Sequence, residues 1–426
     1  MGYRACISGF KSIRHGCIDL DGVTVLLGPP ASGKSNLLEA LATLGYALRV
    51  AYESGEWGGV DAIGPLTRYV RARVCNDLLP HPLLGSTGPS KAVITLEHDS
   101  GRVSLSIECE KLWEARLGLE VKANGVTVDK LVIIADLTLQ PPSPPHPIPT
   151  AIEPVEKSLS YLMVLGLLKA IASELVKSSP PARVTRASSK RGLSAGIPVL
   201  RVPSIRFYSF DRMVPAYMIA SGYLSERRPS YLREDGANAG WILYADRKLA
   251  HYVNSLLREI TGVEVRVDNE GRVLFYDKDI GMPPLLASDT IVRLLYITLA
   301  VKTAKTISLS QVEEGVSVQL SPLLLIEEPE SHIYPLVHEV LVDLLRSGSR
   351  KTPIILTTHS VSIAQLLVEK VDANIYYLRR VEEGSVVCTV DKEKMINEYY
   401  GVDDIIRLEK KMIEEGIVKC GTRHWR

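Results

Sequence analysis

A segment near the start of the chain has the residue types and spacing needed to hold phosphate groups. It matches the pattern G-x-x-x-x-G-K-[ST] in full: Gly28, Pro29, Pro30, Ala31, Ser32, Gly33, Lys34 and Ser35. Such a loop turns its backbone N–H groups towards phosphate oxygens, and the helix after it adds partial positive charge. Lys34 then supplies a full charge to the β- and γ-phosphates, and the Ser35 hydroxyl is a ligand for Mg²⁺. The segment predicts a site for ATP and magnesium.

Two acidic residues end an apolar run further along the chain. Leu323–Ile326 is followed by Glu327 and Glu328, and Pro329 then stops the strand. Glu327 would lie near the Mg²⁺ held by Ser35, and Glu328 would polarise the attacking water, which requires an acceptor within hydrogen-bond reach. A solvent-exposed acidic turn after a core strand is the alternative interpretation.

A histidine ends a second apolar run. His359 follows Ile354–Thr358 and lies 31 positions after Glu328, with one expected helix between them. A histidine at such a strand end can hydrogen-bond a γ-phosphate and so respond to its presence. The alternative is a purely structural histidine.

Hydrophobic spacing predicts the elements that position these residues. Strands are expected at 5–10, 17–20, 23–27, 92–96, 103–107, 117–121, 263–267, 272–276, 322–326 and 352–358. Helices are expected at 35–48, 155–176, 242–261, 291–305, 335–345 and 360–369. The proline-dense stretch 141–154 predicts a boundary or linker. The basic stretch 178–196 predicts an exposed loop, with contact to a phosphate backbone as the alternative.

Composition limits the classes of protein that the chain can represent. The 426 residues carry a net charge of +1 and are 46% hydrophobic, which is ordinary for a globular protein and argues against a strongly basic nucleic-acid platform. Arg4, Lys11 and Arg14 interrupt the start, so no signal peptide is expected. The best apolar run, Tyr161–Val176, is too short to span a bilayer. We therefore expect a soluble, cytoplasmic protein with no membrane partner.

The six cysteines are scattered and form no C-x-x-C pair, which predicts reduced and mostly buried thiols rather than a zinc site or disulfides. They are Cys6, Cys17, Cys75, Cys109, Cys388 and Cys420.

The order of these motifs resembles the heads of ABC-type ATPases, and in particular the RecF-, SMC- and OLD-like members of the AAA family. The resemblance includes the segments Gly33–Leu41, Tyr231–Asn238 and Glu327–Pro335, although no long coiled coil or Toprim domain is expected here. It implies an α/β P-loop NTPase fold: an ABC-ATPase-like mixed sheet flanked by helices, with an antiparallel β subdomain and a helical insertion. The implied division is a first half of the head at 1–150, an insertion at 151–285 and a second half at 286–426.

The resemblance also implies roles for individual residues. Gly28–Asn36, including Asn36, is the nucleotide loop, Glu327 is the acid beside the metal, and Glu328 is the catalytic glutamate. His359 is the switch histidine, and Lys34 completes the catalytic set. Heads of this type dimerise around two ATP molecules, and residues 331–335 would then lie near the dimer partner.

The loop expected to cap the partner's nucleotide departs from the family pattern. The family has Leu-Ser-x-Gly before a helix, whereas this chain has Leu286-Ala287-Ser288-Asp289-Thr290. Ser288 and Thr290 can donate hydrogen bonds to a nucleotide, and the helix N-terminus after them is intact. Asp289 either lies where a γ-phosphate should dock or acts as the N-cap of the helix, and the cap is preferred. Gln140 is the one candidate for the family's Q-loop glutamine, with an ordinary loop glutamine as the alternative.

Three functions are compatible with these motifs. The first is an ATP-hydrolysing head that forms a homodimer on ATP and acts on DNA or an effector protein in repair or defence. The second is a nucleotide-gated switch with little turnover, suggested by Asp289. The third is an interaction subunit of a toxin–antitoxin or nuclease system, suggested by the lack of a nuclease motif.

Overall fold

The computed structural model describes most of the ATPase-like motifs and their surroundings. The described residues are 2–52, 91–99, 101–111, 114–123, 126–136, 183–185, 199–210, 216, 219, 231–311, 316–382, 384–397 and 414–420. The expected linker 141–154, the expected helix 155–176 and Gln140 lie outside these ranges.

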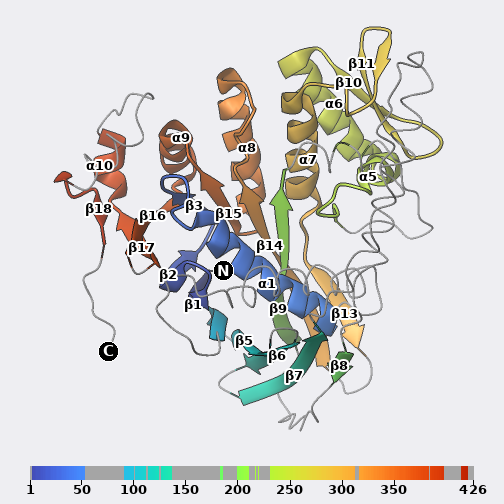
Figure 1. The fold of residues 1–426 in the computed structure, drawn as a ribbon. Coiled ribbons are helices and arrows are strands. Elements are labelled where there is room, and N and C mark those ends of the chain that lie inside the picture. The colour runs from blue at the N-terminus through green and yellow to red at the C-terminus, as the bar shows by residue number, and fades with distance from the viewer. Residues whose placement is uncertain are drawn as a thin grey trace, which may run out of the picture.

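One large mixed sheet forms the centre of the described structure (Figure 1). Its order is β13-β14-β15-β3-β16-β17-β2-β1-β4-β5-β6-β7-β8, with β9 also paired to β14 and β18 to β17. The strands are β1 Tyr3–Phe10, β2 Ile13–Leu20, β3 Val23–Leu27, β4 Lys91–His98, β5 Gly101–Lys111, β6 Glu114–Ala123, β7 Val126–Asp136, β8 Arg183–Thr185, β9 Val199–Ser209, β13 Ile307–Gln311, β14 Val316–Glu327, β15 Ile354–Thr358, β16 Asn374–Val381, β17 Gly384–Val390 and β18 Val418–Lys419.

Helices flank this sheet, and a small second sheet packs against α5 and α6. The second sheet contains β10 Glu264–Val267, β11 Val273–Asp277 and β12 Ile280–Met282. The described helices are α1 Lys34–Tyr52, α5 Ala239–Ala245, α6 Arg247–Thr261, α7 Asp289–Thr303, α8 His338–Ser349, α9 Val361–Val371 and α10 Lys392–Asn397, with a 3₁₀ turn at Pro335–Val337.

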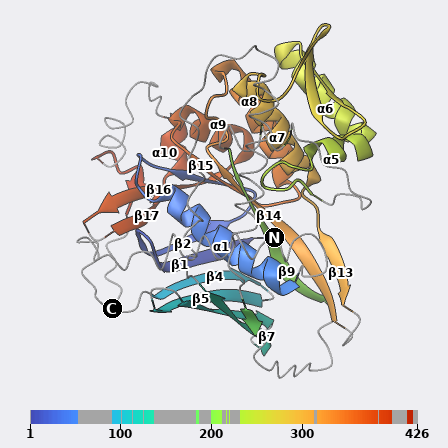
Figure 2. The same cartoon turned by 45° about the vertical axis from the view of Figure 1, so that its right-hand side comes forward.

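The central strands are buried on both faces, as expected for parallel strands covered by helices. Alternate residues of β14 enter two cores: Leu324 packs with α7, α8 and α9, while Leu323 and Leu325 pack with α1. Figure 2 shows α1 between the central strands and the antiparallel strands β4 and β5. Helices α7, α8 and α9 form a contiguous layer. These two layers fix the ends of β3, β14 and β15, where the three sequence motifs occur.

The mixed α/β fold expected from the family resemblance is confirmed. The three N-terminal strands, the antiparallel strands of 92–121 and the hairpin around 269–271 all form. The expected single helix 242–261 is wrong, because the chain forms α5 and α6 with a break at Asp246, whose carboxylate accepts from the Leu249 N–H and caps α6. The three-part division of the chain stays a prediction.

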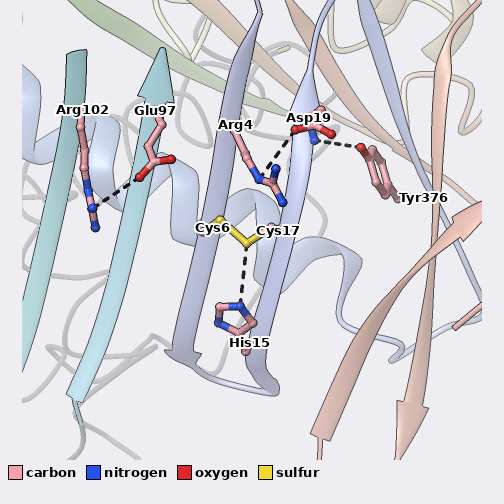
Figure 3. Close-up of a disulfide and its surroundings, with 8 residues drawn as sticks. All are labelled: Arg4, Cys6, His15, Cys17, Asp19, Glu97, Arg102 and Tyr376. Atoms are coloured by element: carbon pink, nitrogen blue, oxygen red, sulfur yellow. Dashed lines mark hydrogen bonds and ion pairs between the residues drawn. A yellow bond between two sulfur atoms is a disulfide. The ribbon is translucent and has the colours of Figure 1, made fainter. Parts of the chain in front are cut away.

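Four cysteines form two disulfides, so the expectation of reduced thiols is wrong for them. Cys6 and Cys17 face each other across β1 and β2, and Cys388 of β17 is bonded to Cys420. Figure 3 shows the first pair beside His15, whose Nε2 lies 3.8 Å from the Cys17 Sγ. Sequence spacing missed both pairs because strand pairing, not proximity in the chain, brings their backbones together.

Within the described ranges, no helix combines the length and apolar character needed to cross a lipid bilayer.

Candidate active site

The segment expected to bind phosphate forms a tight loop between β3 and α1. Gly28 has φ 154° and Gly33 has φ 101°, backbone angles that residues with a side chain rarely adopt. A Cβ at Gly33 would lie 2.5 Å from the Ser385 Oγ and 2.9 Å from the Ser12 Oγ. Glycine is therefore required at this position both for backbone conformation and for the close approach of β17 and the β1–β2 turn.

The Lys34 side chain lies in the loop and hydrogen-bonds its backbone. Its Nζ donates to the carbonyls of Gly28 at 2.7 Å and Pro29 at 2.9 Å. Burial lowers the pKa of Lys34 to about 8, an effect that nearby Glu328, Glu330 and Glu327 partly oppose. A negatively charged group at this position would restore the charged form of the amine.

Other atoms of the loop have the chemistry expected of a phosphate cradle. The Ser32 Oγ is buried and has no hydrogen-bond partner among the described residues. Buried hydroxyls are normally paired, so this atom is suited to a ligand oxygen. Asn36 instead donates from Nδ2 to the Ser12 Oγ at 2.7 Å and so fixes the first turn of α1 against the β1–β2 turn. The loop fits a triphosphate on these observations.

The two acids lie at the end of β14, next to the ends of β15 and β9. The Glu327 Oε2 accepts from the Ser209 hydroxyl at 2.7 Å. The Glu328 backbone has φ 41°, and its N–H donates to the Thr357 Oγ1 at 3.1 Å. The Glu328 Oε2 accepts from Ser331 at 2.9 Å. Hydrogen bonds from Ser209, Ser331 and β15 therefore hold the acidic turn in place, unlike a loose surface turn.

His359 lies between the catalytic candidates Glu328 and Lys34. Its Nε2 is 3.0 Å from the Glu328 Oε1, and its Nδ1 is 3.4 Å from the Lys34 Nζ. Burial and then the Lys34 charge lower the pKa of His359, although Glu328 opposes this shift. A neutral imidazole that accepts at Nδ1 and donates at Nε2 satisfies both contacts. The structure thus brings together all three residues that the sequence singled out.

Residues 286–290, which we call the signature-like loop, lie against the turn that follows Glu328. Ser288, not the preferred Asp289, is the N-cap of α7: the Ser288 Oγ accepts from the Ile291 N–H at 3.4 Å. Asp289 is the first helical residue, and its carboxylate lies 4.0 Å from the His332 imidazole. The Thr290 hydroxyl donates to the His332 carbonyl at 3.0 Å. The roles of Ser288 and Thr290 towards a nucleotide stay predictions.

Sequence reasoning missed two buried residues beside this site. Arg293 of α7 donates to the Glu328 carbonyl at 2.7 Å and lies over the Phe210 ring at 4.2 Å. Glu330 accepts from the Thr358 hydroxyl on the strand that precedes His359. Arg293 lies in the expected helix 291–305 and Glu330 follows the two acids directly, but sequence spacing alone does not show that a side chain reaches another strand.

One known family matches part of this chain. Residues 180–364 match the family described as "AAA domain, putative AbiEii toxin, Type IV TA system". None of the curated proteins is detectably similar. Three SMC head structures are similar over most of their length. An SMC head bound to the C-winged helix domain of ScpA is 14% identical, with TM-score 0.48, and covers 93% of this chain and 99% of its own.

The two other head structures are comparably distant. The SMC head domain from Thermotoga maritima is 14% identical with TM-score 0.37, and the match covers 91% of this chain and 98% of that one. A head with an extended coiled coil, bound to the C-terminal domain of ScpA derived from Pyrococcus furiosus, is 12% identical with TM-score 0.45, covering 97% and 99%.

The fold and the site define a P-loop ATPase. The family match contains the two acids and His359, and β3 brings the phosphate loop beside them because it pairs with β15 in the same sheet. The family match over residues 180–364 agrees with the resemblance to AAA-family ATPases that the motifs indicated.

Proposed function

We propose that the site binds ATP with Mg²⁺ and hydrolyses it through Glu328. Ser35 lies in the first turn of α1, and Glu327 ends β14 two strands away from β3, so these two residues are the proposed metal ligands. The metal would neutralise charge on the β- and γ-phosphates. Lys34 would exchange its two loop carbonyls for phosphate oxygens, and the unpaired Ser32 hydroxyl would donate to the same group.

The contact between Glu328 and His359 is the observation that carries this proposal. In the described state, these side chains hydrogen-bond each other at 3.0 Å. Each would turn to a new partner when the nucleotide binds: Glu328 would accept a proton from the attacking water, and His359 would donate from Nε2 to the γ-phosphate. Because the pKa of His359 is lowered, it donates as a neutral imidazole and leaves Glu328 ionised.

Turnover measurements test this mechanism. Glu328→Gln should lower Mg²⁺-dependent phosphate release by about 10²- to 10⁴-fold, the usual contribution of a general base. ATP binding should persist, because the phosphate loop is untouched. Glu270→Gln, on the exposed turn of the β10–β11 hairpin, is the matched control and should retain full turnover. Unchanged turnover in Glu328→Gln would refute the assignment.

We further propose that two copies dimerise on ATP through the face formed by the signature-like loop and the turn after Glu328. Three large apolar side chains are exposed there: Leu286 at 67%, Tyr334 at 64% and Leu336 at 81%. The Thr290–His332 hydrogen bond shows that the two segments are in contact. Exposed apolar side chains grouped on one face favour a protein partner, and a second copy would bury them while its α7 N-terminus approached the nucleotide.

The dimer proposal has its own test. Glu328→Gln with ATP and Mg²⁺ should elute from a sizing column at twice the monomer mass. Adding Leu336→Asp should restore the monomer, whereas adding Ile280→Asp should not. Ile280 is 68% exposed but belongs to the separate three-stranded sheet. Equal dimerisation of both double variants would reject this face.

The cellular role proposed for the chain is DNA maintenance or defence in the cytoplasm, with DNA or an effector protein as partner. The matched family's description names a toxin of a toxin–antitoxin system, which supports the defence role. A nucleotide-gated switch with little turnover is the second candidate, favoured by Asp289 within the signature-like loop. ATP-dependent dimerisation with no phosphate release by the wild type would select the switch.

A further inference from the structure

We infer that Glu330 is a positioning residue for ATP hydrolysis: its buried carboxylate fastens the turn after β14 to the strand end that carries His359. This inference rests on the proposed function, in which Glu328 and His359 act at the γ-phosphate. Among the described residues, no hydrogen bond or ion pair joins the Glu330 side chain to the side chain of Glu328 or His359. It acts by fixing the backbone of His359 relative to Glu328.

Glu330 is linked to the residues on either side of His359 in the sequence. The Thr358 hydroxyl donates to the Glu330 Oε1, and the same hydroxyl accepts from the Ser360 N–H at 2.9 Å. The N–H of His359 also interacts favourably with the Glu330 carboxylate. One carboxylate therefore restrains the backbone immediately before, at and after the histidine.

The turn that carries Glu330 is itself rigidly closed around Glu328. The Ser331 N–H donates to the Glu328 carbonyl at 3.1 Å, and the Ile333 N–H donates to the Glu330 carbonyl at 2.9 Å. The Ser331 hydroxyl holds the Glu328 carboxylate at 2.9 Å. A shift of Glu330 relative to Thr358 would therefore change the separation between the Glu328 carboxylate and the His359 ring.

A second link holds the other member of the pair. The Thr357 hydroxyl accepts from the Glu328 N–H at 3.1 Å, so β15 fixes the backbone of Glu328. Glu330 makes the reciprocal connection, from the β14 side to the residues around His359. The two links cross between the same strand ends, and together they set the 3.0 Å approach of the two side chains.

The burial of Glu330 argues against a role in stability alone. The residue is 9% exposed, and its Oε2 is buried without a hydrogen-bond partner among the described residues. Burial raises the pKa of its carboxyl group. Burying a carboxylate with one unpaired oxygen costs stability, and an apolar residue would fill the space at lower cost. A carboxylate here is better explained by the geometry that it imposes on the turn and the histidine.

Steady-state kinetics on the full chain test the inference. Glu330→Ala and Thr358→Val each remove the link and should lower kcat by about 10- to 100-fold, since small misplacements of reacting groups have effects of this size. Binding of a non-hydrolysable ATP analogue should change by less than about threefold, because neither residue contacts the phosphate loop. Glu330→Gln retains an oxygen acceptor for Thr358 and should keep kcat within about threefold of the wild type. Glu339→Ala, an exposed glutamate of α8, is the matched control.

The outcomes separate this inference from the proposed function. If the wild type and Glu328→Gln behave as predicted above but Glu330→Ala and Thr358→Val both retain wild-type kcat, the positioning role is wrong. It is also wrong if analogue binding falls in parallel with kcat. The double variant Glu330→Ala/Thr358→Val should be no slower than the worse single variant, because both remove one link. If Glu330→Ala does not fold, Thr358→Val decides the question. Wild-type protein without turnover would reject both proposals.

Discussion

Lys34 should take up a proton when a nucleoside triphosphate binds above pH 8. Without nucleotide, burial lowers the pKa of Lys34 to about 8. Contact with phosphate oxygens favours the charged amine and raises this pKa. The amine is about 10% deprotonated at pH 7 and about 90% deprotonated at pH 9 for a pKa of about 8. Binding should therefore take up about 0.1 proton at pH 7 and about 0.9 at pH 9.

The same linkage fixes how affinity depends on pH. Lys34 must be protonated before its amine can hold the phosphates. The affinity for nucleotide therefore falls as pH rises through the pKa of Lys34 in the nucleotide-free protein. Between pH 7 and pH 9 the expected loss is about tenfold, or about 1.4 kcal/mol. Other groups at the site contribute little in this window, since the pKa of His359 is lowered and phosphoryl groups complete their second ionisation near pH 6.

Calorimetric titration with a non-hydrolysable ATP analogue measures both quantities. The binding heat at each pH is compared in two buffers with different ionisation enthalpies, and the difference gives the number of protons taken up. Lys34→Arg is the control, because a guanidinium stays charged throughout this range and should give no proton uptake. Equal wild-type affinity at pH 7 and pH 9, with heats independent of buffer, would refute the assigned burial of the Lys34 amine.

Three further predictions concern the framework around the site. Cys388→Ser removes the disulfide to Cys420, which closes a loop of 32 residues. It should lower the free energy of unfolding, measured by denaturant titration without reductant, by about 4 kcal/mol. A change near zero would contradict the pairing. Gly33→Ala should abolish binding of a fluorescent ATP analogue without loss of fold by circular dichroism, because its Cβ would collide with a side chain 2.5 Å away at φ 101°. Glu234→Gln should lower the free energy of unfolding by about 3 kcal/mol, since it leaves the buried Arg49 guanidinium without its charged partner, and an unchanged denaturation midpoint would count against that pair.

The phosphate loop and its neighbours could be predicted because their signals are local. One continuous segment contains β3, the glycine loop and α1, so its sequence alone predicts the order strand, loop and helix. The apolar runs before Glu328 and His359 identify two buried strands. Their mutual arrangement follows from the family order of these motifs. The structure adds the distances that make a site from them.

Elements whose stability depends on distant partners were not predictable. β9 pairs with β14 along its whole length, yet its sequence contains Pro203 and the buried Arg206, whose guanidinium lies 3.6 Å from the Tyr231 ring. Neither residue favours a strand until its partners are known. The sequence also does not predict the first half of β14, because Pro322 indicates the start of the strand. A proline ordinarily lies at the start of a strand rather than in its middle.

The disulfide between Cys388 and Cys420 changes how damage to the C-terminal region would be detected. Any single backbone cleavage between these two residues leaves both fragments covalently attached, because the Sγ–Sγ bond closes the chain into a ring. A nicked molecule would keep its full mass on a non-reducing gel and would separate into two bands only after thiol treatment. Intact migration under oxidising conditions is therefore no proof that this region of the polypeptide is continuous.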